Sequence, residues 1–262
     1  MNWTRQPPTF TGFNRRYPKP GFCYLPTALP YGDLVRGLIG VPGSTEIRRP
    51  TSRGVGYHSI RQTNGGLNFG NILAINAETF TILQVANPAS AAQYGNGFSQ
   101  RAFPDPNTHV AIYWNTDVNV AAVAGKFACL MSVGAVNIGV AGTTGTPVDG
   151  AFHAWGVTRD GSSGRPVLWV DGAKPAQTSS GAGGTFLQSS AQTRLGNPGL
   201  YTTDSALATT ADHALCVCWD SVLPDALMAE LGRNPWQLFA PLPARVYSFP
   251  SAFPRFFAQV IG

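Results

Sequence analysis

The chain has 262 residues, of which 44% are hydrophobic and 12% charged, and its formal net charge is +5. This length suits one large domain with a sizeable core. No apolar run approaches the roughly 20 residues of a membrane helix, so membrane insertion is not expected. The start, MNWTRQPP, has no apolar signal core, and we expect the chain to be made and assembled in a cytoplasm.

The first region, residues 1–50, is rich in proline, aromatic residues and arginine. Proline at this density favours extended paths, yet the aromatic content is too high for a disordered linker. We predict an extended N-terminal arm that packs on its own domain or on a neighbouring subunit. The assembly contacts expected in this arm are Arg15, Arg16, Tyr17, Phe22 and Tyr24.

The arginines of this arm also raise the question of nucleic acid binding. They are scattered among prolines and aromatic residues and form no dense basic run. Arginine is favoured at protein interfaces, so we expect hydrogen bonds between subunits and no nucleic acid partner.

Strand patterns begin near residue 51 and continue to residue 233, which we take as the main domain. The 30 glycines and 21 prolines of the chain fit an all-β protein with many turns. FTILQVA at residues 80–86 is apolar throughout, which indicates a strand buried on both faces. The other expected strands lie at 55–62, 67–73, 109–115, 126–133, 136–140, 185–190, 193–197 and 212–221.

A hairpin is the strongest local prediction and lies within residues 152–178. Two apolar runs flank a turn at residues 160–164, and the second run closes on Asp171-Gly172, a strong turn pair. Trp155 and Trp169 lie in the two runs, and we expect both in the core.

One short helix is predicted at residues 224–231. Pro224 suits its first turn, and Gly232 suits its C-terminal cap. Residues 234–262 form a C-terminal extension rich in proline and aromatic residues, in which Trp236, Phe239, Phe256 and Phe257 are further assembly candidates. The apolar end, PRFFAQVIG, suits a strand added to a neighbour's sheet edge.

Several motifs resemble a known family. The hairpin pattern, with V-T-R-D-G at residues 157–161 and V-D-G at residues 170–172, resembles laminin-G-like, concanavalin A-like jelly-roll domains. NPWQLF at residues 234–239 and GDLVRGLIG at residues 32–40 resemble a phage and prophage virion branch of these domains. The resemblance covers roughly residues 32–240 and implies a concanavalin A-like β-sandwich with Pro-rich terminal arms. Leu223-Pro224 stands where that branch has Leu-Ser, which changes the helix cap.

Catalysis is not expected from the acidic residues. Glycan hydrolases need two carboxylates across a sugar-binding face, and the three glutamates, Glu46, Glu78 and Glu230, show no such spacing. No Gly-x-Ser-x-Gly elbow occurs, and a strand-facing structural role is favoured for histidines such as His153 and His213. We therefore predict that the protein is not an enzyme.

Metal sites and cofactors are not expected either. Asp160 and Asp171 precede glycines and are explained as turn residues, without calcium. The cysteines have no zinc-ligand spacing. Cys216 and Cys218 would share one strand face, so we expect buried free thiols in place of a disulfide.

Glycan binding requires aromatic side chains for stacking and amide or acidic groups for sugar hydroxyls. We expect several such residues in loops at the edges of the sandwich. For each of them, contact with a sugar, contact with another protein and no binding role are the three possibilities. The candidates are Tyr94, Asn96, Trp114, Asn115, Asn197, Tyr201 and Asp204.

The resemblance implies a structural protein of a bacteriophage virion. We favour a tail or tail-fibre component, homo-oligomeric, that docks on tail, portal-proximal or capsid proteins and contacts a host glycan. A capsid decoration protein is the alternative, and a secreted lectin or glycan hydrolase is the third reading.

Overall fold

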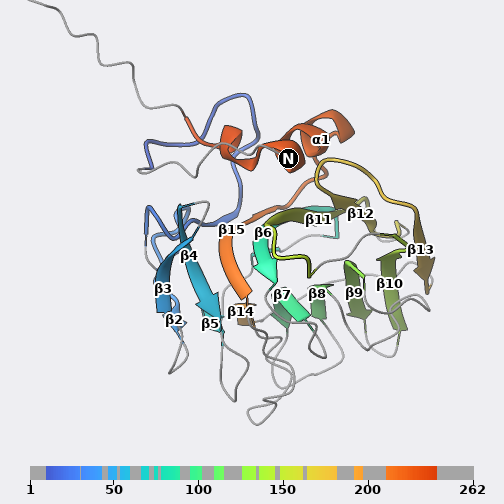
Figure 1. Ribbon diagram of the computed structural model, residues 1–262. Coiled ribbons are helices and arrows are strands. Elements are labelled where there is room, and N and C mark those ends of the chain that lie inside the picture. Colours follow the sequence, from blue (N-terminus) through green and yellow to red (C-terminus); the bar gives the residue numbers. More distant parts are fainter. Residues whose placement is uncertain are drawn as a thin grey trace, which may run out of the picture.

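The structure is a computed structural model, and it shows two antiparallel sheets that face each other (Figure 1). It describes residues 10–29, 31–42, 47–51, 54–59, 66–70, 74–75, 78–88, 95–101, 109–114, 126–133, 136–144, 148–161, 164–181, 192–196 and 211–240. The predicted strand at 185–190 lies outside the described residues.

The first sheet has seven strands, in the order β12-β11-β6-β15-β4-β3, with β1 also paired to β15. Its strands are β1 (Phe22–Tyr24), β3 (Ile47–Thr51), β4 (Gly54–Ser59), β6 (Phe80–Pro88), β11 (His153–Arg159), β12 (Val167–Val170) and β15 (Ala211–Trp219). β4 pairs with residues 211–213 of β15 and β1 with residues 216–218, so these two strands share one edge of β15. β1 belongs to the predicted N-terminal arm, and this part of the arm is therefore a strand of the sandwich.

The second sheet has eight strands, in the order β13-β10-β9-β8-β7-β14-β5-β2. They are β2 (Val41–Pro42), β5 (Leu67–Asn68), β7 (Gly95–Arg101), β8 (His109–Trp114), β9 (Ala128–Val133), β10 (Val136–Gly142), β13 (Gln177–Ser180) and β14 (Gln192–Leu195). The predicted all-β sandwich with one short C-terminal helix is confirmed.

The main core lies between the two sheets. Aromatic and aliphatic side chains from both sheets fill it, among them Phe22, Phe98 and Trp155, all fully buried. Their burial removes large apolar surfaces from water, which stabilises the fold by roughly 25 cal/mol for each Å² buried. Phe22 and Tyr24, which the sequence suggested for assembly, are both part of this core.

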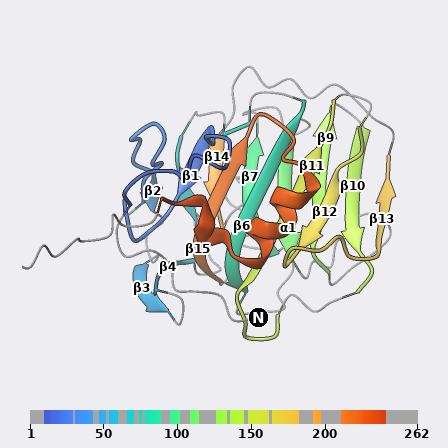
Figure 2. The ribbon, with the colours of Figure 1, turned by 90° about the horizontal axis from the view of Figure 1, so that it is seen from above.

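A second core lies on the other face of the seven-stranded sheet. The N-terminal segment, helix α1 (Asp225–Arg233) and the 3₁₀ helix η1 (Pro235–Leu238) cover this face (Figures 1 and 2). Central strands of this sheet are therefore buried on both sides, and β15 is buried throughout. The prediction of a doubly buried strand at 80–86 is confirmed, because each of these residues is buried in β6.

The NPWQLF motif holds the N-terminal segment in this layer. Phe13 forms a bridge with Phe239, and the Asn14 backbone N–H donates to Leu238 O at 2.8 Å. The Asn14 side chain donates to Gln237 O at 3.0 Å. Trp236 of the same motif is 6% exposed and packs in the second core. The motif thus joins the two ends of the described chain.

The predicted hairpin is confirmed as β11 and β12, which pair from Trp155–Val170 to Thr158–Val167. Trp155 and Trp169 are both buried, as expected. A two-residue turn follows β12, in which Asp171 and Gly172 have φ values of 50° and 79°. Positive φ at both positions is the geometry that Asp-Gly favours.

The helix prediction is wrong at its ends. α1 begins at Asp225 and runs to Arg233, with Pro224 as N-cap and Asn234 as C-cap. Gly232 lies inside the helix and is not its cap. Its lack of a side chain instead allows close contact with Gly172 of the β12 turn.

Candidate functional site

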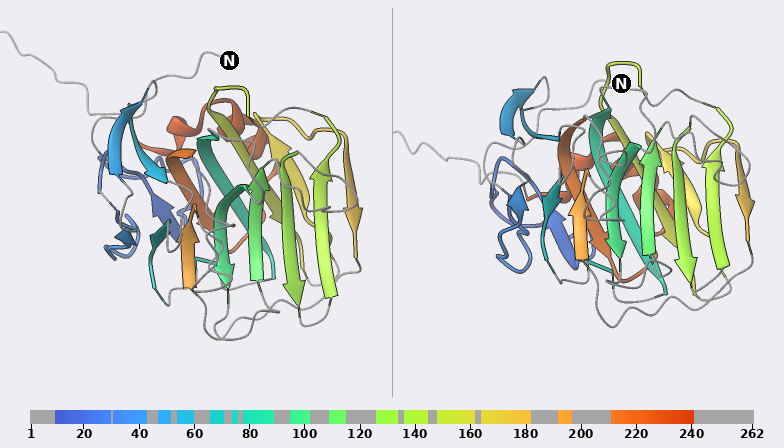
Figure 3. Two further views of the ribbon diagram at one scale, coloured as in Figure 1. Left: turned by 60° about the horizontal axis from the view of Figure 1, so that its bottom comes forward. Right: turned by 90° about the horizontal axis from the view of Figure 1, so that it is seen from below.

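The outer face of the eight-stranded sheet is the face turned away from α1 and η1, and Figure 3 shows it from that side. Phe98, Ile112 and Cys129 are register neighbours that point into the main core. Because side chains alternate along a strand, the residues one position away face outward. The outward row across the sheet is Arg194, Ser99, Ala111, Leu130 and Gly139.

The residues of this outward row are buried at the centre of the sheet and more exposed toward β14. Ser99 and Ala111 are 2% and 1% exposed, whereas Arg194 is half-buried. Arg194 Nη2 donates to Gln192 Oε1 at 2.6 Å on the same strand. Asn68 of β5 is the register neighbour of Arg194. Guanidinium and amide groups therefore meet on this part of the face, and these groups suit hydrogen bonds to sugar hydroxyls.

Asn68, Gln192 and Arg194 are not among the site residues predicted from the sequence. Their common face depends on the pairing of β14 with β7 and β5, which are distant in the sequence. The expected strand at 193–197 was the available signal, but periodicity alone does not say which side of a strand faces outward.

Two of the predicted glycan-binding positions come together at one end of this sheet. Asn96 lies at the start of β7 and Trp114 at the end of β8, and Gly95 is the register partner of Trp114. The N–H of Gly196 donates to Gly97 O at 2.9 Å, which brings the end of β14 to the same place. The ends of β7, β8 and β14 therefore meet at Asn96, Trp114 and Gly196.

The remaining glycan candidates cannot be placed in this way. Tyr94, Asn115, Asn197, Tyr201 and Asp204 lie outside the described residues. Asn115 directly follows the last residue of β8, and Asn197 directly follows Gly196 in the sequence.

The assembly candidates divide into buried and exposed residues. Tyr17, Trp236 and Phe239 are 4%, 6% and 4% exposed, and they pack in the second core of their own chain. Arg15 and Arg16 are exposed. Phe256 and Phe257 lie outside the described residues. The buried aromatic residues therefore contribute to the chain's own fold, since their side chains have little surface left for another subunit.

Arg16 and Tyr17 both contact helix α1. Arg16 Nη2 lies 2.7 Å from Glu230 Oε2. Burial of the phenol, together with the nearby Glu230 carboxylate, raises the pKa of Tyr17 to about 12. Glu230, one of the three glutamates considered for catalysis, is thus committed to the contact between α1 and the N-terminal segment.

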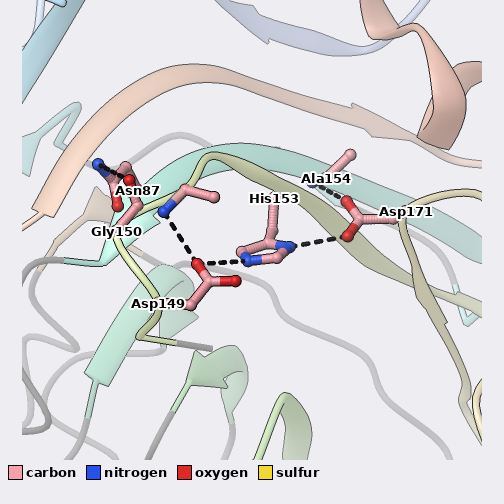
Figure 4. Close-up of polar contacts among 7 residues, drawn as sticks. Asn87, Asp149, Gly150, His153, Ala154 and Asp171 are labelled. Atoms are coloured by element: carbon pink, nitrogen blue, oxygen red, sulfur yellow. Dashed lines mark hydrogen bonds and ion pairs between the residues drawn. The ribbon is translucent and has the colours of Figure 1, made fainter. Parts of the chain in front are cut away.

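A histidine between two carboxylates is the second polar cluster (Figure 4). His153 Nδ1 lies 2.7 Å from Asp171 Oδ2, and Nε2 lies 3.1 Å from Asp149 Oδ1. Asp171 Oδ1 also accepts the Ala154 N–H at 3.0 Å, and Asp149 Oδ1 accepts the Ala151 N–H at 2.9 Å. The cluster ties the start of β11 to the turn after β12.

The electrostatics of this cluster favour the charged imidazole. Burial, the largest single effect, lowers the pKa of His153, but the hydrogen bonds and charges of Asp171 and Asp149 together raise it above its usual value. Burial opposes ionisation of Asp149, and its bonds with Ala151 and His153 nevertheless lower its pKa. Both ring nitrogens of His153 lie against carboxylates. The charged imidazole therefore links the start of β11 to the turn after β12.

Other histidine and acidic groups are held in the fold. His213 is fully buried, and its Nδ1 lies 2.8 Å from Gln84 Nε2. Asp33 is fully buried, and its Oδ1 accepts the N–H groups of Cys23 and Val35. Among the described residues, no group of three or more His, Cys, Asp or Glu side chains is placed to hold a metal ion. No helix in the described part of the chain is long and apolar enough to cross a membrane.

No protein-family model and no curated protein matches this sequence. Solved structures do match. Domain 4 of AbnA, a GH43 extracellular arabinanase from Geobacillus stearothermophilus solved with arabinotriose, aligns with a TM-score of 0.60 and 14% identity. That alignment covers 82% of this chain and 98% of the domain.

Two larger proteins contain a similar unit. Trypanosoma rangeli sialidase, solved with sialic acid, aligns with a TM-score of 0.55 and 13% identity over 84% of this chain and 33% of its own. The binding domain of botulinum neurotoxin serotype G aligns at 0.55 and 10% identity, over 81% of this chain and 50% of its own. At such identities the likeness establishes the fold alone, which is a two-sheet jelly-roll β-sandwich.

Proposed function

We propose that this chain is a non-enzymatic structural protein of a bacteriophage virion, located on the tail or a tail fibre, whose sandwich contacts a host glycan. The glycan would bind at the end of the eight-stranded sheet where β7, β8 and β14 meet. The single observation that supports this site is that the ends of β7, β8 and β14 meet there, at Asn96, Trp114 and Gly196. Arg194 and Gln192 lie on the adjoining outer face.

The virion part of the proposal rests on the NPWQLF resemblance. In this fold the motif anchors the N-terminal segment through Asn14 and Phe13. A domain whose two ends are fixed together on one sheet, with the opposite sheet face turned away from them, suits a module that docks on one side and binds on the other. The non-enzymatic part is supported by the commitment of Glu230, Asp149 and Asp171 to contacts within the fold.

Copy number in purified particles tests the virion part. Quantitative mass spectrometry against the major capsid protein is expected to find a few to a few dozen copies, as for a tail component. Hundreds of copies would indicate a capsid decoration protein and not a tail component. Absence from particles would overturn the virion proposal.

Glycan-array binding tests the lectin part with matched variants. We expect binding that Asn96→Ala and Arg194→Gln each weaken by at least about tenfold, the loss of one or two hydrogen bonds to a ligand. Ser180→Ala, at the exposed end of β13 on the far edge of the same sheet, serves as the control and should bind as the unchanged protein does. Absence of binding to any glycan, or equal binding by all variants, would overturn this site.

A further inference from the structure

Three aliphatic side chains stand out on the surface. Leu38, Ile39 and Val41 are 40%, 60% and 69% exposed, and they are the exposed large hydrophobic residues among those whose exposure is described. Single exposed aliphatic residues are ordinary, but a contiguous cluster marks an interaction surface. These three fall within four consecutive positions, and we call them the aliphatic patch.

The patch is held firmly by backbone hydrogen bonds. The Asp33 N–H donates to Leu38 O at 2.8 Å, and the Gly40 N–H donates to Tyr31 O at 2.6 Å. Val41 is in β2 and pairs with Asn68 of β5. A surface already fixed in one conformation loses less entropy when a partner binds.

Gly40 explains why the flanking side chains face outward. A Cβ at Gly40 would lie 3.0 Å from Leu67 Cδ1 and 3.1 Å from Phe69 Cδ1, both residues of the main core. Gly40 therefore faces the core, and Ile39 and Val41, one position away on each side, face the solvent.

The position of β2 indicates what kind of contact this surface makes. β2 is the last strand of the eight-stranded sheet and is two residues long, ending at Pro42. A short edge strand with proline resists the addition of a further strand. The patch thus offers side-chain contacts to a partner. A stable interface between two globular faces buries roughly 800 Å² on each partner, and three residues are too few to supply that area. A short apolar segment fits it better.

The chain itself carries such a segment. Residues 251–262, SAFPRFFAQVIG, include Phe256, Phe257, Val260 and Ile261 and no acidic residue. We propose that this C-terminal segment of a neighbouring copy docks on the aliphatic patch. Two apolar surfaces that are each costly to expose to water are then buried together.

The anchor from which this segment starts, and the composition of the residues that follow it, favour docking on a neighbouring copy over docking on the same chain. The described chain ends at Ala240, whose N–H donates to Gly12 O and whose carbonyl accepts the Thr11 hydroxyl at 2.9 Å. Residues 241–262 reach at most about 70 Å from this anchor. Pro241, Pro243 and Pro250 give the first part a composition typical of semi-rigid spacers, which favours reach over folding back. Patch and segment are different surfaces, so each copy uses both, and the copies form a ring where the rotation between neighbours closes and an open chain where it does not.

Light scattering on the full-length protein gives the first test. We expect an oligomer whose dissociation constant rises at least tenfold in the double variant Ile39→Ser/Val41→Ser, and equally in Phe256→Ser/Phe257→Ser. Combining the two pairs should add little further loss, because both remove the same contact. Ala173→Ser, an exposed substitution on the turn after β12, is the control. Circular dichroism should show an unchanged fold, since the replaced patch residues are exposed.

A cross-link between two different chains gives the decisive test. Copies with Val41→Cys are mixed with copies with Val260→Cys and oxidised, and a disulfide-linked heterodimer is expected on a non-reducing gel. Ala173→Cys mixed with Val260→Cys should not cross-link. A chain that carries both cysteines could instead form an internal disulfide while the mixture of single variants does not cross-link. That result would show that the segment docks on its own chain and would contradict docking on a neighbouring copy. A monomer at all concentrations, or equal cross-linking of the control, would overturn the docking site. These outcomes do not depend on glycan binding or on particle copy number.

Discussion

The backbones of Gly172 and Gly232 are in direct contact where the turn after β12 meets helix α1. A Cβ at Gly232 would lie 2.6 Å from Gly172 Cα, and one at Gly172 would lie 2.7 Å from Arg233 Cγ. Gly172 also has a φ of 79°, which residues with side chains rarely adopt. Helix and hairpin therefore approach as closely as two backbones allow.

Gly232→Ala should destabilise the protein by about 1–3 kcal/mol, because the new methyl group meets backbone atoms that cannot move aside. The free energy of unfolding in urea measures this effect. Gly21→Ala is the matched control, since the nearest atom to its Cβ would be Asp220 Oδ2 at 3.7 Å. Equal stability of the two variants would mean that α1 shifts away from the hairpin without cost.

Trp236→Ala should be the most damaging change in the NPWQLF motif, with a loss of about 3–5 kcal/mol for a buried tryptophan. Gln237→Ala should cost less than about 1 kcal/mol, because the Gln237 side chain makes one long contact, 3.5 Å, with the Tyr17 hydroxyl. The Gln237 carbonyl bond from Asn14 is unaffected by this substitution. Denaturant unfolding measures both variants, and similar losses for the two would argue against a packing role of the tryptophan.

The sequence predicts the hairpin well because its information is local. The turn pair Asp171-Gly172 and the apolar runs around Trp155 and Trp169 lie within residues 152–178. The strand at 80–86 is predicted for the same reason, since its apolar run is continuous. Such elements are encoded by neighbouring residues and do not depend on distant partners.

Features set by distant contacts could not be predicted in this way. A glycine after a helical pattern ordinarily marks a cap, whereas α1 continues through Gly232, whose missing side chain leaves room for Gly172 of a distant turn. Likewise, the placement of Arg194 on the outer face follows from the pairing of β14 with β7. Phe22 is an aromatic residue in a Pro-rich segment, and its burial depends on pairing with Cys218 of β15.

The four cysteines should be unreactive in the folded protein. Cys23, Cys129, Cys216 and Cys218 are all buried free thiols. Burial raises the pKa of Cys129 to about 12 and those of Cys23 and Cys218 well above their usual value, which suppresses the reactive thiolate. A thiol reagent at pH 8 is expected to modify none of them before unfolding, and all four in denaturant. Rapid reaction of one thiol in the native protein would contradict the burial.

Stability should depend on pH through His153. Its folded pKa is raised, so its contribution is complete below the unfolded value of about 6.5 and is lost as pH rises through the folded pKa. The pKa of Asp149 is lowered, so its contribution is present above its unfolded value of 3.8 and is lost as pH falls below that. The difference in unfolding free energy between the unchanged protein and His153→Gln should therefore be greatest between these two limits, near pH 5–6, at about 1–3 kcal/mol. It should shrink steadily toward pH 9.

Proton NMR of the His153 ring checks the cause of this dependence. The ring is expected to titrate above pH 6.5, and Asp149→Asn should lower its pKa, because one of its two carboxylate partners loses its charge. The Asp171 contact, at 2.7 Å, remains in that variant and keeps the ring in place. A stability difference that grows as pH rises, or a ring pKa unaffected by Asp149→Asn, would show that the imidazolium is not what links β11 to the turn after β12.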